Sequence, residues 1–106
     1  MNERLNLTAR EGQILRSAIE ILRQEMDPPR IILFGSRASG RAAAGSDFDL
    51  AIDQRKPPLR REREIRERVN DSAGLFKVDI IYLPDVGEDF RELILQTGKV
   101  IYEKAA

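Results

Sequence analysis

Hydrophobic and polar positions follow two different periods along this chain, and the period changes several times between its ends. In three long segments apolar residues recur every three or four positions, as in helices that bury one side. Between them lie short runs that are nearly all apolar or alternate residue by residue, as in buried strands. The pattern predicts helices over 8–24, 59–73 and 88–97, and strands over 30–35, 47–53 and 76–83.

Local signals mark where several of these elements begin and end. Thr8 and Glu11 have the spacing of a capping box, in which each side chain satisfies an amide group at a helix start. Pro28 and Pro29 end the first helix, because neither proline can supply an amide hydrogen to a continuing helix. Two shorter elements complete the prediction, a small-residue helix and a terminal edge strand, over 36–44 and 99–103.

The order of the predicted elements is α-β-α-β-α-β-α, with the edge strand last. That order predicts an α/β (α+β) fold in which helices pack on a small mixed sheet. In the last helix we expect Phe90, Leu93 and Ile94 to face inward. With 106 residues the chain is long enough for one hydrophobic core, so we expect a single domain over 1–106.

Composition excludes several kinds of chemistry. The chain has no cysteine and no histidine, which excludes a thiolate zinc site, a cysteine nucleophile and an imidazole base. Metal binding and proton transfer would therefore fall to carboxylates, whose hard oxygen atoms suit Mg²⁺ or Mn²⁺. No segment has the length of a membrane span or the pattern of a signal peptide, so we expect a cytoplasmic protein.

Charge is balanced, with 18 basic and 18 acidic residues. Balance of this kind is not typical of proteins whose affinity comes from neutralising many phosphates of DNA or RNA. The helix predicted over 59–73 is rich in arginine, but Glu62, Glu64 and Glu67 are interleaved with the arginines. This favours a solvated or partner-facing helix over direct nucleic-acid binding.

Asp47 and Asp49 lie two positions apart in a predicted strand. Strand residues two apart project to one face, so the two carboxylates should lie side by side. Their repulsion in a partly desolvated place would be relieved by a divalent cation. An isolated Asp-x-Asp sequence is, however, more often only the polar end of a strand.

A third carboxylate, Asp79, interrupts the apolar strand predicted over 76–83. An unpaired carboxylate in such a strand is costly, so Asp79 either joins the other two around a metal or pairs with an arginine such as Arg30. In a small sheet the three strands could bring Asp47 and Asp49 beside Asp79. Three converging carboxylates are what two-metal phosphoryl transfer requires.

Gly35 and Ser36 follow the first strand, where a short helix should begin. The free amide groups of a helix start suit a phosphate, the serine hydroxyl adds a donor, and glycine lets a ligand approach the backbone. The ordinary alternative is a strand-to-helix turn with a serine cap. Arg37 and Arg41 could neutralise outer phosphates, although surface solvation explains Arg41 better.

Together these residues resemble the signature of the DNA polymerase β-like nucleotidyltransferase superfamily. In that superfamily a strand ends in Gly-Ser and Asp-x-Asp follows about ten residues later; here ten residues separate Ser36 from Asp47. Asp79, within VDIIYL, matches the third carboxylate. The small size and the ending FRELILQTGKVIYE are most similar to the minimal nucleotidyltransferase (MNT) group, and the resemblance extends from about Pro29 to Glu103.

The resemblance implies a Mg²⁺-dependent enzyme that transfers AMP from ATP to a hydroxyl group and releases pyrophosphate. It implies two Mg²⁺ ions, with Mn²⁺ as an alternative, held by the catalytic carboxylates of Asp47, Asp49 and Asp79. It also implies that the β- and γ-phosphates are held by the nucleotide-binding residues Gly35, Ser36 and Arg37.

The acceptor of the AMP group is the most open part of the reaction. Minimal proteins of this group resemble antitoxins of HEPN/MNT toxin–antitoxin systems, which adenylylate a tyrosine of a HEPN-domain ribonuclease toxin. We expect no separate acceptor domain in so short a chain, so the acceptor would lie on a partner in a hetero-oligomer, with self-association a further option. Two alternatives are a non-catalytic antitoxin that neutralises its partner by contact, and an aminoglycoside-type small-molecule nucleotidyltransferase that acts with a partner.

Overall fold

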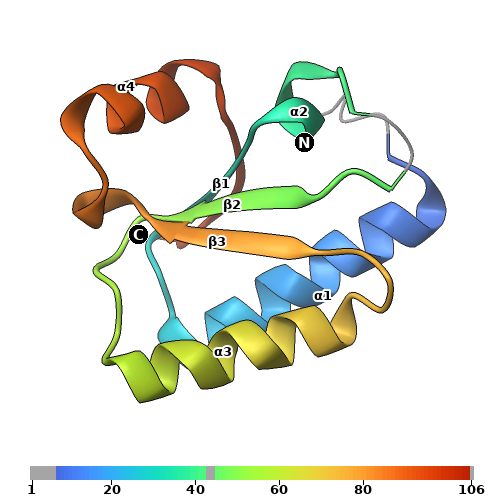
Figure 1. Cartoon of the computed structure of the whole chain (residues 1–106), viewed down its shortest axis with the longest axis horizontal. Coiled ribbons are helices and arrows are strands. Elements are labelled where there is room, and N and C mark those ends of the chain that lie inside the picture. The colour runs from blue at the N-terminus through green and yellow to red at the C-terminus, as the bar shows by residue number, and fades with distance from the viewer. Residues whose placement is uncertain (1–6, 43–44, 106) are drawn as a thin grey trace.

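The computed structural model describes residues 7–42 and 45–105, and its elements follow the predicted order (Figure 1). The helices are α1 (Ala9–Met26), α2 (Ser36–Ser39), α3 (Leu59–Ser72) and α4 (Glu88–Thr97), with a 3-10 turn over Leu83–Asp85. The strands are β1 (Arg30–Phe34), β2 (Phe48–Ile52), β3 (Val78–Tyr82) and β4 (Lys99–Glu103). The predicted α/β fold class, including the terminal strand, is confirmed.

The four strands form one mixed sheet in the order β3-β2-β1-β4. Strand β1 pairs antiparallel with both β2 and β4, whereas β2 and β3 are parallel. The register aligns Phe34 with Asp49, and Asp49 with Asp79, across three neighbouring strands. Two of the three predicted carboxylates therefore lie in one row of the sheet.

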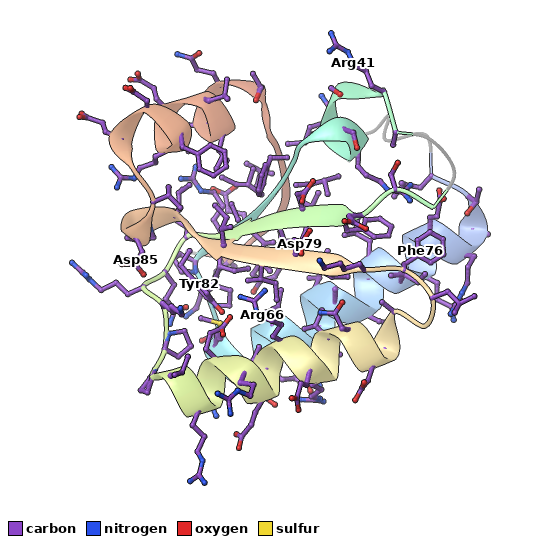
Figure 2. The ribbon with its side chains drawn as sticks, in the orientation of Figure 1. Arg41, Arg66, Phe76, Asp79, Tyr82 and Asp85 are labelled. Atoms are coloured by element: carbon purple, nitrogen blue, oxygen red, sulfur yellow. The ribbon has the colours of Figure 1, made fainter. Side chains whose placement is uncertain are left out.

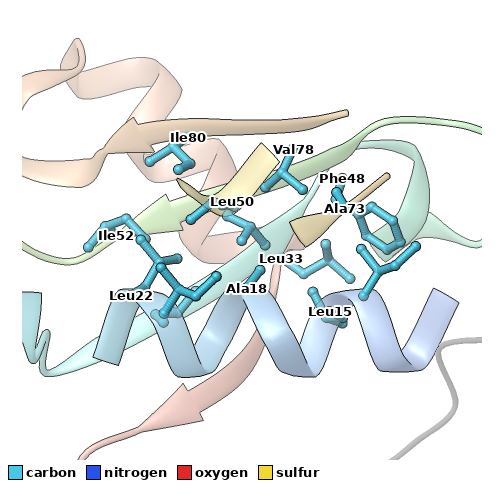
Figure 3. Close-up of a cluster of buried hydrophobic side chains, with 14 of the residues drawn as sticks. Leu15, Ala18, Leu22, Leu33, Phe48, Leu50, Ile52, Ala73, Val78 and Ile80 are labelled. Atoms are coloured by element: carbon cyan, nitrogen blue, oxygen red, sulfur yellow. The ribbon is translucent and has the colours of Figure 1, made fainter. Parts of the chain in front are cut away.

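Helices cover the two faces of this sheet unequally (Figure 1). Helices α1 and α3 pack side by side on one face (Figure 1). The larger hydrophobic cluster lies on this side of the sheet, and Figure 3 shows it above α1. We call this the core face; its buried strand side chains include Leu33, Phe48, Leu50, Val78 and Ile80. The opposite face, which we call the α4 face, holds a smaller cluster made of Ile32, Ala51, Leu83 and Ile94.

The signals at the ends of α1 act as the sequence predicts. The Thr8 hydroxyl accepts a hydrogen bond from the Glu11 amide, and the Glu11 carboxylate accepts one from the Thr8 amide, each at 3.1 Å. This capping box starts the helix. Asp27 ends it in the left-handed conformation, with φ 49°, and the two prolines then lead into β1.

Two predictions about helices need correction. The short helix after β1 extends only from Ser36 to Ser39, because Gly40 ends it; the last two residues of the predicted range, 43–44, lie outside the described residues. In α4 only Ile94 is buried, whereas Phe90 and Leu93 are 42% and 54% exposed. The reason is that α4 covers only part of this face of the sheet. Phe90 contacts the sheet through the Phe34 ring, which it meets edge to face with 5.8 Å between the two ring centres.

The arginine-rich helix α3 uses part of its charge within the chain. Arg68 pairs with Glu25 of α1 at 2.7 Å, and Arg66 pairs with Glu62. Glu62 is buried, and it also accepts a hydrogen bond from the Tyr82 hydroxyl at 3.0 Å. These contacts fasten α3 to α1 and β3. Among the helices of the described residues, none combines the length and the apolar character needed to cross a membrane.

Candidate active site

Asp49 is the central carboxylate of the α4 face. Its neighbours Phe48 and Leu50 belong to the core, so the alternation of β2 turns Asp49 to the opposite face. Burial raises the pKa of Asp49 above its ordinary value, and the negative charges of Asp79 and Asp47 raise this pKa further. A carboxylate that other anions destabilise is a suitable ligand for a cation.

Asp79 lies directly beside Asp49 in the parallel register of β2 and β3, and Figure 2 shows Asp79 on β3. Its side chain is 38% exposed, and the Lys77 ammonium lies 3.4 Å from one of its oxygen atoms. The alternative in which Asp79 pairs with Arg30 is wrong, because Arg30 pairs with Asp53 at 3.0 Å. Sequence reasoning did not single out Lys77, although its position two residues before Asp79 is the signal that places both on one side of an extended segment.

Asp47 lies at the margin of this group. Strand β2 begins at Phe48, one residue later than predicted, so Asp47 belongs to the preceding loop and is exposed. Its charge still contributes to the raised pKa of Asp49. In residues 7–42 and 45–105 no three carboxylates are gathered tightly enough to form a ready-made metal cluster. Asp49 and Asp79 are therefore the fixed pair of the site, with Asp47 close by.

The turn after β1 contacts the central carboxylate. A Cβ atom on Gly35 would collide with Oδ2 of Asp49, so this carboxylate rests directly against the glycine backbone. Gly35 has φ 76° and ψ −154°, a conformation essentially restricted to glycine. Backbone conformation and close contact both require glycine at this position.

Ser36 starts α2 and is exposed on the same turn. The carbonyl group of Gly35 accepts hydrogen bonds from the amides of Ala38 and Ser39. The preceding two amides, those of Ser36 and Arg37, fall in the first turn, where a helix has no internal acceptor for them. These amides and the Ser36 hydroxyl are the donors that the turn can offer to an anion.

The Arg37 side chain lies elsewhere than the sequence suggests. It is buried, and its guanidinium group lies 4.3 Å from the ring centre of Phe48, a residue of the core face. It pairs with Glu11 at 3.2 Å and donates two hydrogen bonds to the carbonyl of Ser46. The structure does not bring this guanidinium to the carboxylates. Arg41, by contrast, is exposed and points away from the sheet (Figure 2).

These residues fit a magnesium-type ion. Protein-bound Mg²⁺ commonly uses one or two carboxylates, and water molecules and substrate phosphates complete its octahedral shell. Asp49 and Asp79 provide such a pair, and Asp47 provides a further oxygen donor near them. A cation here would relieve the repulsion that raises the pKa of Asp49.

Comparisons of the sequence with known proteins point to one family. The family model described as polymerase beta, nucleotidyltransferase matches residues 16–106. A Haemophilus influenzae protein named as a probable protein adenylyltransferase MntA is 35% identical over 102 residues, which cover 94% of this chain and 86% of that protein.

Solved structures share the fold. A chain of a toxin–antitoxin complex with AMP-PNP superposes with a TM-score of 0.70 at 22% identity, covering 84% of this chain and 73% of that chain. A chain assigned as a minimal nucleotidyltransferase superposes with a TM-score of 0.68 at 22% identity, covering 92% of this chain and 98% of that chain. At this identity the likeness establishes the fold, and the fold is that of a nucleotidyltransferase.

Proposed function

The chain belongs to the polymerase beta nucleotidyltransferase family, and on that premise we propose that it transfers AMP from ATP to a hydroxyl group of another protein. The main support for this proposal is that Gly35, Asp49 and Asp79 lie together. Gly35 directly follows β1 and contacts Asp49 of β2, which lies beside Asp79 of β3. A glycine turn against two adjacent carboxylates combines a place for phosphate with ligands for its metal.

In the proposed reaction the acceptor oxygen attacks the α-phosphorus of ATP, the bond from that phosphorus to the bridging oxygen breaks, and pyrophosphate leaves. Mg²⁺ bound by Asp47, Asp49 and Asp79 would neutralise charge on the triphosphate and on the leaving group. Asp79 would also accept the proton of the acceptor hydroxyl. Its place on β3, at the edge of the sheet, and its half-exposed side chain leave it accessible from outside the chain.

The turn after β1 would bind the β- and γ-phosphates. Gly35 admits the phosphate close to the backbone, and the amides of Ser36 and Arg37 and the Ser36 hydroxyl would donate hydrogen bonds to it. The contribution of Arg37 to phosphate binding is therefore its amide group and not its side chain. Lys77 would add positive charge beside Asp79.

We further propose that the acceptor is a tyrosine of a HEPN-type toxin, with which the chain forms a hetero-oligomer. Two findings support this. The relative from Haemophilus influenzae is named a probable protein adenylyltransferase, and a solved structure of the same fold is a toxin–antitoxin complex with AMP-PNP.

A labelled-transfer assay tests the proposal. The chain is incubated with Mg²⁺, ATP labelled in the α-phosphate, and a HEPN-type toxin protein from the same organism. We expect label on that protein with the wild type and with Asp71→Asn, an exposed carboxylate of α3, but not with Asp49→Asn. If the wild type transfers no label and still neutralises the toxin, the chain acts by contact alone and the proposed activity is wrong.

A further inference from the structure

Arg37 combines an unusual place with an unusual set of contacts. Among residues 7–42 and 45–105 it is the one basic side chain that is buried, with 4% of its surface exposed. Removing a charged group from water is costly unless the group is paired and hydrogen-bonded. The contacts that offset this cost therefore indicate the role of Arg37.

The guanidinium group of Arg37 is enclosed by four partners on the core face. The Glu11 carboxylate lies 3.2 Å away, and the Ser46 carbonyl accepts hydrogen bonds from Nε at 3.2 Å and from Nη2 at 2.7 Å. The ring centres of Phe48 and Phe76 lie 4.3 and 5.7 Å, respectively, from the central carbon atom, Cζ, of the guanidinium group. A planar, forked cation suits this setting and a lysine ammonium does not.

These contacts join three separate segments of the chain. Glu11 lies in the first turn of α1, and Arg37 follows the turn at Gly35 directly. Ser46 is the residue immediately before Asp47. The two hydrogen bonds to Ser46 therefore set the distance between the phosphate turn and the carboxylate at the margin of the site.

The backbone after Asp47 is held separately. The amide of Phe48 donates a hydrogen bond to the carbonyl of Lys77 at 2.9 Å, which ties the start of β2 to the residue before β3. Asp47 thus lies between two anchored positions, one held by β3 and the other by Arg37. Only the second depends on a side chain.

We propose that Arg37 is a positioning residue, which with Glu11 fixes the Ser46–Asp47 segment so that the carboxylate of Asp47 stays beside Asp49. The inference rests on the proposed function, in which Asp47 shares a metal with Asp49. We call the pair of Arg37 and Glu11 the brace. Because the brace lies on the core face, it acts on the site through the backbone of Ser46 and touches neither substrate nor metal.

Metal dependence distinguishes this role from a general role in stability. The variants are Arg37→Met, Arg37→Lys and Glu11→Gln, each measured at a temperature where circular dichroism shows it folded. The control is Leu22→Ala, which removes a fully buried side chain in the last turns of α1, away from the brace.

We expect Arg37→Met to raise the half-saturating Mg²⁺ concentration for AMP transfer by about tenfold or more and to lower kcat, because losing a residue that supports a metal ligand commonly weakens metal binding to this extent. Arg37→Lys should lie between it and the wild type, and Leu22→Ala should keep the wild-type Mg²⁺ dependence.

Binding of Mn²⁺ in the presence of AMP-PNP, followed by water proton relaxation, separates this inference from the proposed activity. If the wild type binds Mn²⁺ and transfers no AMP, the proposed activity fails, and weaker Mn²⁺ binding by Arg37→Met still supports the positioning role. A folded Arg37→Met variant with wild-type Mn²⁺ affinity and Mg²⁺ dependence would overturn the inference, as would a wild type that binds no Mn²⁺. If Arg37→Met does not fold, Glu11→Gln decides the question by the same two measurements.

Discussion

The two faces of the sheet hold their charges in opposite ways. On the core face two buried glutamates are each paired with an arginine, Glu11 with Arg37 and Glu62 with Arg66. On the α4 face Asp49 lies among the like charges of Asp79 and Asp47. The core face uses charge to hold segments together, whereas on the α4 face neighbouring like charges disfavour the ionised form of Asp49, as we expect of the proposed cation site.

The pKa values express the same contrast. A hydrogen bond from the Thr8 amide, together with the charge of Arg37, holds the pKa of Glu11 below its ordinary value despite burial. Burial and neighbouring carboxylates raise the pKa of Asp49. At neutral pH the ionised form of Glu11 therefore stabilises the folded chain, and the ionised form of Asp49 destabilises it.

The largest expected effect comes from neutralising the central carboxylate. Asp49→Asn should lower the rate of AMP transfer by about 10³-fold or more, because the variant would lose the proposed metal ligand and its preorganised charge. The melting temperature should stay the same or rise, since like-charge repulsion is removed. Initial rates and thermal melts of the same preparation check both statements. A variant that is inactive because it is unfolded would break the proposed division between the faces.

The opposite signature is expected on the core face. Leu22→Ala removes a fully buried side chain between α1 and the sheet and should lower the free energy of unfolding by about 2–5 kcal/mol. At a temperature where the variant is folded, kcat should remain within about twofold of the wild type. Urea unfolding measures the first quantity and the transfer assay the second. A large loss of kcat in the folded variant would show that the core face also governs the chemistry.

Two glycines with similar φ angles but different ψ angles, −154° at Gly35 and 11° at Gly40, sharpen the comparison. Gly35→Ala must accommodate a positive φ and a Cβ against the Asp49 carboxylate, whereas Gly40→Ala, at φ 80°, meets no atom within 4 Å. Gly40→Ala should lose about 1 kcal/mol of stability, and Gly35→Ala should lose more, about 1–3 kcal/mol, because its backbone conformation is essentially restricted to glycine. Only Gly35→Ala should also lose activity, by about 10²-fold, because the carboxylate is displaced. Equal activity losses in both variants would mean that the turn, and not its contact with Asp49, matters for transfer.

The sequence predicts those features of the fold that depend on residues close together in the chain, such as the helices and strands and where they begin. The apolar run VDIIYL was enough to predict the strand that carries Asp79, and the capping box at Thr8 was enough to predict the start of α1. Burial that depends on distant partners could not be predicted in this way. Arg37 has the local sequence of a phosphate ligand, but its side chain is buried against partners from other segments, Glu11 of α1 and the Ser46 carbonyl. The exposure of Phe90 likewise depends on how much of the sheet α4 covers.

The smallest predicted effect concerns Glu62, the second paired glutamate of the core face. Burial alone would raise its pKa, but hydrogen bonds from Arg66 and Tyr82 outweigh burial and lower the pKa below 4.5. A lowered pKa in the folded state contributes stability that is present above the unfolded pKa and is lost as pH falls through the folded one. Glu62→Gln should therefore lower the free energy of unfolding by about 1–2 kcal/mol at neutral pH, and this difference should shrink as pH falls below 4.5. Urea unfolding at several pH values measures it, with the exposed Glu64→Gln on the same helix as the control. A difference that persists unchanged in acid would mean that Glu62 stabilises the core face through its shape and hydrogen bonds and not through its charge.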